Sequence, residues 1–122
     1  MFVESENDPT TDPVVVWTNG GPGAASYFGL MTEVGPLYLD GTSLTTEEYK
    51  STGVPTLYRN ENSWTKFSNL LIINSPSPVG YSYCDPAGVS GSGTSCGTHN
   101  DTRTAIHSAT YLENWMIAYP EF

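Results

Sequence analysis

The chain has 122 residues, of which 38% are apolar and 12% aromatic, enough to build one small globular domain and too many for a disordered chain. Its 13 acidic and 4 basic residues give a formal net charge of −9, which argues against nucleic acid or an anionic membrane as a partner. No apolar run approaches the roughly 20 residues that a membrane span needs.

Two strands and one helix are predicted in the first part of the chain. Residues 2–4 form a short strand, and residues 14–18 form a second, whose unbroken apolar run is typical of a strand covered on both faces. A Gly-rich stretch follows at residues 19–23, which we call the Gly loop. Residues 24–34 are then predicted to form a helix with Phe28, Leu30 and Met31 as its apolar members, ending at Gly35 and Pro36.

The second part of the chain predicts one strand and one long helix. Residues 40–62 are polar and irregular and are interpreted as a surface loop with room for one hairpin. Residues 70–74 predict a second buried strand, followed by a Ser- and Pro-rich loop. A helix is predicted from about residue 102 to 119, with Asn100 or Asp101 as its N-cap. Its apolar stripe consists of Ala105, Ala109, Leu112, Met116 and Tyr119, widened by Trp115.

Strands of the buried type alternating with helices predict an α/β fold with a largely parallel sheet. Two such strands are too few to complete a sheet of this kind. The last helix also runs abruptly into the final residues. We therefore expect the chain to be part of a larger domain.

The two cysteines, Cys84 and Cys96, flank a small polar stretch and suggest a local disulfide, with two unpaired thiols as the alternative. A disulfide would indicate an oxidising compartment. The triplet that begins at Asn100 is a glycosylation sequon and points to the same setting. The first residues, however, lack the basic and apolar regions of a signal peptide.

Several kinds of site are disfavoured by the motifs. The Gly loop matches neither phosphate-binding Gly pattern, and Asn74 stands where a dinucleotide site needs an acidic residue. The two histidines, His99 and His107, have no metal-ligand spacing, so no metal is expected. The GxSxG elbow is absent, and neither histidine has a persuasive partner for a catalytic triad.

A strand that leads through a Gly loop into a helix is the arrangement that supplies one backbone donor of the oxyanion hole in α/β-hydrolases. Bare backbone N–H groups in such a loop can hold a carboxylate or a reaction-generated oxyanion. A purely structural Gly turn remains the alternative from the spacing alone.

Several ordered motifs resemble the serine carboxypeptidase family. The segments W-x-N-G-G-P-G and E-x-G-P of that family resemble residues 17–23 and 33–36, and its S-W-N and S-P-x-x-V-G-F-S-Y segments resemble residues 63–65 and 75–83. The edge strand at residues 2–5, the run at 69–73 and the final helix follow in the family's order, so the resemblance covers nearly the whole chain.

The resemblance implies an α/β-hydrolase fold, with residues 1–122 as the N-terminal part of a single domain, and removal of C-terminal residues from peptides through an acyl-enzyme, with no cofactor. It implies that the backbone N–H of Gly21 binds the oxyanion. Asn19 and the Gly20 backbone would hold the terminal carboxylate of the peptide substrate, with Glu33 hydrogen-bonded into that network and Trp17 bracing the site. A carboxyl group that faces a substrate carboxylate binds best when protonated, so binding is expected to weaken as pH rises.

The chain departs from the family pattern at three places. Ala24 stands where the family usually has a cysteine, so a long-range disulfide is missing. Asn74 replaces a common acidic residue, which puts the local hydrogen bonding in doubt. The family's nucleophile segment, G-E-S-Y-A-G, would begin just after Phe122, with the acid and histidine of the triad further on.

We therefore expect this chain to be a fragment that is inactive by itself, cut from a secreted, lysosomal or vacuolar enzyme. A non-catalytic binding or decoy product is the alternative. A fragment of a carboxypeptidase-like acyltransferase or lyase is a further alternative that the sequence leaves open.

Overall fold

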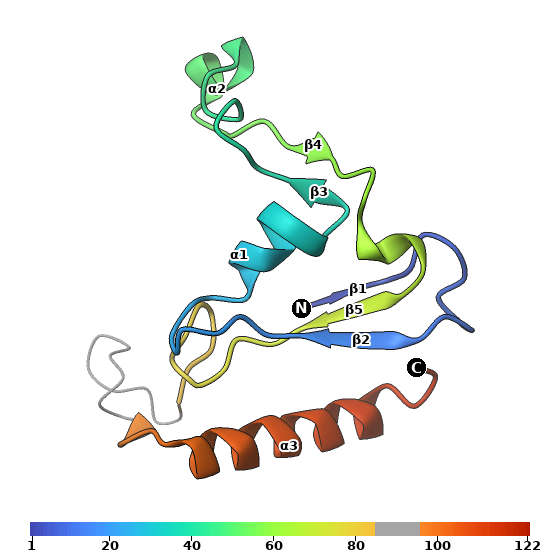
Figure 1. Cartoon of the computed structure of the whole chain (residues 1–122), viewed down its shortest axis with the longest axis vertical. Coiled ribbons are helices and arrows are strands. Elements are labelled where there is room, and N and C mark those ends of the chain that lie inside the picture. Colours follow the sequence, from blue (N-terminus) through green and yellow to red (C-terminus); the bar gives the residue numbers. More distant parts are fainter. Residues whose placement is uncertain (85–95) are drawn as a thin grey trace. The chain divides into compact units, whose positions relative to one another are not determined.

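The computed structural model describes residues 1–84 and 96–122 (Figure 1). The chain divides into two compact units, the first formed by Met1–Val15 and Phe28–Leu71 and the second by Val16–Tyr27 and Ile72–Phe122. The described elements, in chain order, are β1 (Phe2–Val3), β2 (Val14–Trp17), α1 (Tyr27–Gly29), the π-helical turn η1 (Leu30–Val34), β3 (Leu37–Tyr38), α2 (Glu47–Thr52), β4 (Tyr58–Arg59), the 3-10 turn η2 (Trp64–Lys66), β5 (Asn69–Ile72) and α3 (Asp101–Ala118).

Strand β5 is the middle strand of a three-stranded sheet, with β1 on one side and β2 on the other. It pairs antiparallel with β1, in the register Phe2↔Leu71 and Val3↔Leu70. The N–H groups of Asn69 and Ile73 donate to the carbonyls of Pro13 and Trp17, over 2.9 and 3.0 Å, so β5 runs parallel to β2. The sheet is therefore mixed, and the prediction of a largely parallel sheet is corrected to this extent.

The strand predicted at residues 70–74 is confirmed as a core strand. Leu70, Leu71 and Ile72 have at most 2% of their surface exposed. The strand predicted at residues 14–18 is also found, as β2, but the prediction that both its faces are covered is wrong. Val16 is 43% exposed, and no residue of β2 is buried. An unbroken apolar run does not distinguish a middle strand from an edge strand, and β2 is an edge strand among the described residues.

The helix predicted at residues 24–34 begins later, at Tyr27, and continues as the π-helical turn η1. Leu30 and Val34 are each 3% exposed and point into the first unit, whereas Phe28 is 62% exposed, contrary to its predicted apolar role. The turn ends at Gly35, where a Cβ atom would lie 2.2 Å from the carbonyl oxygen of Leu30. Only glycine fits this close approach.

The segment predicted to be an irregular loop, residues 40–62, contains a helix. The hydroxyl of Thr46 accepts from the N–H of Tyr49 at the start of α2, and Gly53 ends the helix in the left-handed region with φ +72°. These local capping signals are visible in the sequence and were not used. Strands β3 and β4 pair antiparallel on either side of α2 in the chain. Because β3 precedes residue 40, this pairing is not the hairpin expected within residues 40–62.

The final helix is confirmed with Asn100 as its N-cap, whose Oδ1 accepts from the N–H of Arg103 over 2.9 Å. Its predicted apolar stripe is not buried: Met116 and Tyr119 are 61% and 49% exposed, and no residue of α3 is buried. The helical spacing is correct, but the burial expected for the stripe is not found. Trp115 instead packs its ring near those of Tyr119 and Phe122.

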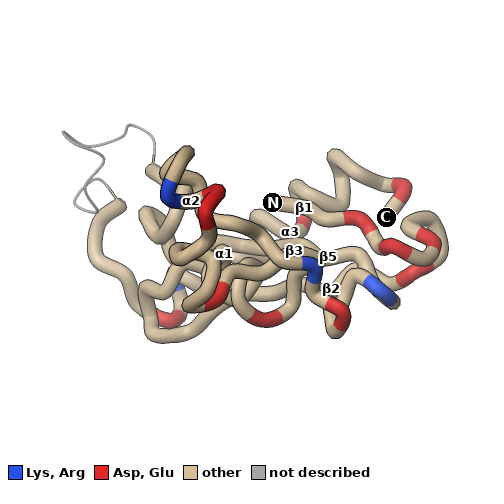
Figure 2. Tube along the Cα trace, turned by 90° about the horizontal axis from the view of Figure 1, so that it is seen from above, with Lys and Arg blue, Asp and Glu red and all other residues tan. Residues whose placement is uncertain are grey.

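Acidic residues recur along the trace of both units, and basic residues are few (Figure 2). In the described part of the chain, no helix is long and apolar enough to cross a membrane.

Candidate functional site

Two glycines of the Gly loop, residues 19–23, have backbone conformations that other residues rarely adopt. Gly21 has φ +129° and Gly23 has φ +102°. A Cβ atom on Gly21 would also lie 3.1 Å from the N atom of Gly23 and 3.2 Å from that of Ala24. The carbonyl of Gly20 accepts from the N–H of Ala24 over 3.2 Å and closes the turn. Gly21 and Gly23 are therefore required by the backbone conformation of the loop.

The loop is held by Ser26, a residue that the sequence reasoning did not single out. Its hydroxyl is 0% exposed; it accepts from the N–H of Asn19 over 3.0 Å and donates to the carbonyl of Ile73 over 2.5 Å. Ser26 thus ties the first residue of the loop to the end of β5. In the sequence, only the hydroxyl of Ser26 among small neighbouring residues points to this anchoring role.

The replacement of an acidic residue by Asn74 put the local hydrogen bonding in doubt, but the structure shows this hydrogen bonding intact. The Oδ1 of Asn74 accepts from the N–H of Ser26 over 2.8 Å, as a carboxylate oxygen at this position also would. The Asn74 side chain packs closely against Gly80, where a Cβ atom would lie 2.5 Å from Nδ2 and where φ is +59°.

The orientation of the Asn19 side chain is fixed by Trp17. The indole Nε1–H donates to Oδ1 of Asn19 over 2.8 Å. An indole N–H can only donate, so the amide oxygen must face it and the amide nitrogen must face away. Asn19 therefore presents its two Nδ2 hydrogens, and no acceptor among the described residues meets them.

A cavity of about 550 Å³ in the second unit is bordered by the Gly loop. Its described lining is Val16, Thr18, Asn19, Gly20, Gly21, Pro22, Ile73, Ser75, Pro76, Thr104, Ser108 and Leu112. The hydroxyls of Ser75 and Ser108 lie 3.1 Å apart on its wall. Three of the residues singled out from the sequence, Asn19, Gly20 and Gly21, thus face one cavity.

Glu33 belongs to the first unit, in the turn η1, and its side chain is exposed. Its backbone is tightly held: the Asn60 side chain donates from Nδ2 to the carbonyls of Glu33 and Gly35, 2.9 Å each. The hydroxyl of Ser63 donates to the carbonyl between them, that of Val34, over 3.0 Å. The motif at residues 63–65 includes Ser63, but the hydrogen bonds of Asn60 and Ser63 could not be predicted, since their partners are more than 20 residues away.

The histidines form no catalytic arrangement within the described residues. Both ring nitrogens of His99 are buried without a hydrogen-bond partner there, and His107 hydrogen-bonds neither a serine nor a carboxylate. No group of three potential metal ligands was found in that same part of the chain.

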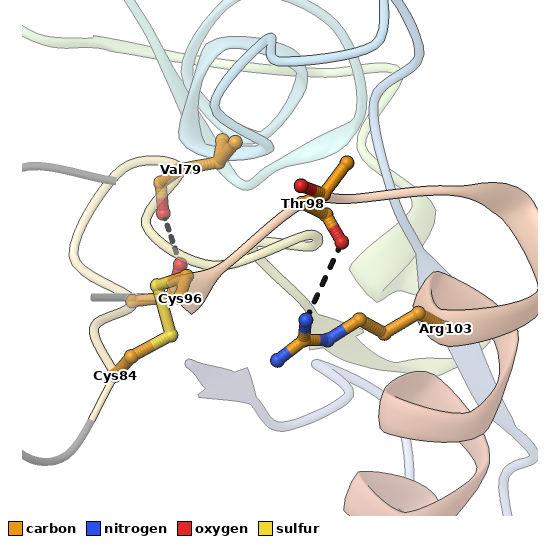
Figure 3. Close-up of a disulfide and its surroundings, with 6 residues drawn as sticks. Val79, Cys84, Cys96, Thr98 and Arg103 are labelled. Atoms are coloured by element: carbon orange, nitrogen blue, oxygen red, sulfur yellow. Dashed lines mark hydrogen bonds between the residues drawn. A yellow bond between two sulfur atoms is a disulfide. The ribbon is translucent and has the colours of Figure 1, made fainter. Parts of the chain in front are cut away.

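Cys84 and Cys96 are joined in a disulfide, with an S–S distance of 2.01 Å (Figure 3). Beside it, the guanidinium of Arg103 donates to the carbonyl of Thr98 over 3.3 Å. Asn100, the first residue of the sequon, is exposed.

The comparison with known proteins agrees with the motifs. A model of the serine carboxypeptidase family matches residues 1–122. Similar relatives include serine carboxypeptidase-like 20 of Arabidopsis thaliana, 37% identical over 99% of this chain and 22% of the relative, and serine carboxypeptidase 1 of Hordeum vulgare, 39% identical over 98% and 21%. The lysosomal protective protein of Mus musculus is 38% identical over 99% of this chain and 22% of the relative.

The chain therefore belongs to the serine carboxypeptidase family, a family of hydrolases. It spans only about a fifth of the length of these curated relatives.

Proposed function

We propose that this chain supplies the oxyanion loop and the substrate-carboxylate site of a serine carboxypeptidase with an α/β-hydrolase fold. In this proposal residues 1–122 are the N-terminal part of a single domain. The enzyme removes C-terminal residues from peptides through an acyl-enzyme, and the Ser, Asp and His of the triad come from outside the chain. Family membership and the geometry of the Gly loop support the proposal.

The observation that carries the proposal is the bond from Trp17 to Asn19. It leaves Asn19 with a donor group at the edge of the cavity, next to the bare backbone of Gly20. A carboxylate accepts hydrogen bonds and donates none, so a site built from an amide N–H₂ group and backbone N–H groups suits it. The negative charge needs no lysine or arginine in such a site.

Gly21 is proposed to donate its N–H to the oxyanion of the tetrahedral intermediate. No acceptor among the described residues meets this N–H, and Gly21 lines the same cavity as Asn19. Loss of one such donor costs roughly two to three orders of magnitude in rate. Because φ of Gly21 is +129°, Gly21→Pro would both remove the donor and strain the loop, so it does not separate the two effects.

Glu33 is proposed to take part in recognition of the substrate carboxylate. Support comes from the family pattern and from the bonds that fix its backbone. The proposed compartment is the secretory pathway, a lysosome or a vacuole. The disulfide, the exposed sequon at Asn100 and the similarity to the lysosomal protective protein of Mus musculus support it.

Binding by the 122-residue chain tests carboxylate recognition without requiring catalysis. An N-blocked amino acid with a free carboxylate is titrated in parallel with its C-terminal amide, using the wild-type chain, Asn19→Leu, and Thr18→Val as a control from the same cavity. We expect the free acid to bind better than the amide, and Asn19→Leu to weaken it by roughly 10- to 100-fold. Equal binding of acid and amide by the wild-type chain would refute the carboxylate site.

The transcript downstream of the Phe122 codon separates the enzyme from a non-catalytic binding product. Continuation into G-E-S-Y-A-G supports the enzyme. A stop codon at that point, together with retained carboxylate binding, supports a binding or decoy function instead.

A further inference from the structure

A second cavity, of about 480 Å³, lies in the same unit between the disulfide and one face of α3. Its described lining is Ser77, Tyr83, Cys84, Cys96, Arg103, His107, Thr110, Tyr111 and Asn114. None of these residues borders the cavity of the Gly loop. The α3 residues follow one another at steps of three and four, so they form one stripe of the helix. We call this cavity the Arg103 pocket.

Arg103 stands apart from the other three basic residues of the chain. The others each form an ion pair with a carboxylate: Lys50 with Glu47, Arg59 with Glu6 and Glu61, and Lys66 with Glu61. Within the described residues Arg103 has no such pair, and its side chain donates a hydrogen bond to the carbonyl of Thr98. A guanidinium carries five N–H donors, so most of them are left for a ligand.

The guanidinium lies close to the backbone of Gly97, whose φ is +71°. A Cβ atom there would lie 2.8 Å from Nη1 of Arg103, so a larger residue would push the guanidinium away. Figure 3 shows the guanidinium directed at Thr98, beside the disulfide. The charge is therefore positioned by the fold, in a chain whose net charge is −9 and whose described lining here contains no carboxylate.

The rest of the lining combines aromatic surface with hydrogen-bond donors. The ring of Tyr83 is largely uncovered, with 74% of the residue exposed, and Tyr111 stands on the α3 wall. Burial raises the pKa of Tyr111, and the nearby Tyr119 and Tyr27 raise it further, so its phenol remains a donor at neutral pH. His107 and Asn114 add polar groups. The site is an open depression, and its volume is that of a small-molecule site.

We propose that the Arg103 pocket binds a small aromatic carboxylate, with its carboxylate on the Arg103 guanidinium and its ring against Tyr83 and Tyr111. A guanidinium can donate to both oxygens of a carboxylate. The aromatic ring of the ligand can pack against the tyrosine rings, which inorganic phosphate cannot do. This site is separate from the proposed carboxypeptidase site and does not depend on it.

The test is a titration of the 122-residue chain, disulfide oxidised, with benzoate, followed by calorimetry and by NMR. Two comparison ligands are used. Benzamide has the same ring as benzoate but no charge, and inorganic phosphate is an anion that has no ring. Arg103→Gln is compared with Lys50→Gln, which changes the net charge equally outside the pocket. We expect benzoate to bind at least about tenfold more tightly than either comparison ligand, and Arg103→Gln, unlike Lys50→Gln, to remove most of that advantage.

Two further variants keep the test decisive. Tyr83→Ser replaces an exposed ring and is expected to fold normally; it should weaken benzoate several-fold and leave phosphate unchanged. Asn19→Leu, which removes the proposed carboxylate site at the Gly loop, should leave the benzoate-induced NMR shifts of Tyr83 and Tyr111 unchanged. Benzoate binding that is lost with Asn19→Leu and kept with Arg103→Gln would place the anion at the Gly loop and overturn the proposal. Equal affinity for benzoate and benzamide, tighter binding of phosphate than of benzoate, or no saturable binding would also overturn it.

Discussion

The side-chain amide of Asn60 donates to the backbone carbonyl of Glu33 over 2.9 Å, across 27 residues of sequence. The same amide nitrogen donates to Gly35, so one side chain binds both ends of a three-residue stretch of backbone. π-helical turns are rare and are frequent at functional sites. Asn60 thus fixes the backbone of the one turn that carries the proposed carboxylate-binding glutamate.

Replacing Asn60 by alanine should lower the free energy of unfolding by about 1–2 kcal/mol, because two carbonyls lose their donor. Asn62→Ala is the matched control, since Asn62 is exposed and its side chain forms no hydrogen bond with the other described residues. Urea unfolding of both variants measures the difference. Equal stability of the two variants would show that the Asn60 bonds do not hold the turn.

Replacing Ser26 by alanine should destabilise the chain by about 1–3 kcal/mol, because the N–H of Asn19 and the carbonyl of Ile73 both lose a buried partner. Ser51→Ala, an exposed serine in α2, should cost much less. Amide hydrogen exchange should also show faster exchange at Asn19 in the Ser26 variant. Unchanged exchange at Asn19 would contradict the anchoring role.

Gly80→Ala should destabilise the chain by at least about 1 kcal/mol, since φ is +59° and the new Cβ would meet Asn74 Nδ2 at 2.5 Å. Gly41→Ala is the control, because a Cβ there has no atom within 4 Å. Thermal unfolding of the two variants gives the comparison. A Gly80 variant as stable as the Gly41 variant would mean that neither the backbone conformation nor the close contact matters.

Asp12 should make stability fall at acid pH. The hydroxyl of Ser5 and the N–H of Asp8 donate to its carboxylate and hold its pKa below the ordinary value of 3.8. The folded-state pKa is thus lower than the unfolded one. The stabilisation is therefore present above pH 3.8 and is lost as pH falls through the folded pKa.

Unfolding free energies of the wild type and Asp12→Asn between pH 6 and pH 2.5 measure this contribution. The variant should be less stable at pH 6, and the gap should narrow as the pH falls below about 4. A gap that does not change with pH would show that the carboxylate charge is not involved.

Elements that are stabilised mainly by interactions between residues close in the sequence were predicted correctly. The apolar run at residues 70–73 marked β5, and a polar cap before a helical pattern marked α3. The helix α2 also has local capping signals in Thr46 and Gly53, but the polar composition of residues 40–62 favoured the prediction of a loop.

What could not be predicted depends on contacts between distant residues. Ser26 acquires its role from Ile73 and Asn74, 47 and 48 residues away, and Asn60 from Glu33. The exposure of Val16 follows from the place of β2 in the sheet, which an apolar run does not encode. For the candidate site, the motif identified Asn19 and Trp17, and the structure added the hydrogen bond that orients them.

The most direct test of the proposed function uses the protein encoded by the complete reading frame that contains this chain. Its kcat/KM is measured for one N-blocked dipeptide as the free acid and as the C-terminal amide, in the wild type, Asn19→Leu and Thr18→Val. We predict a preference for the free acid that Asn19→Leu lowers by roughly 10- to 100-fold and Thr18→Val leaves unchanged. Hydrolysis of acid and amide at equal rates, or a preference for the acid that survives Asn19→Leu, would contradict the proposed carboxylate site.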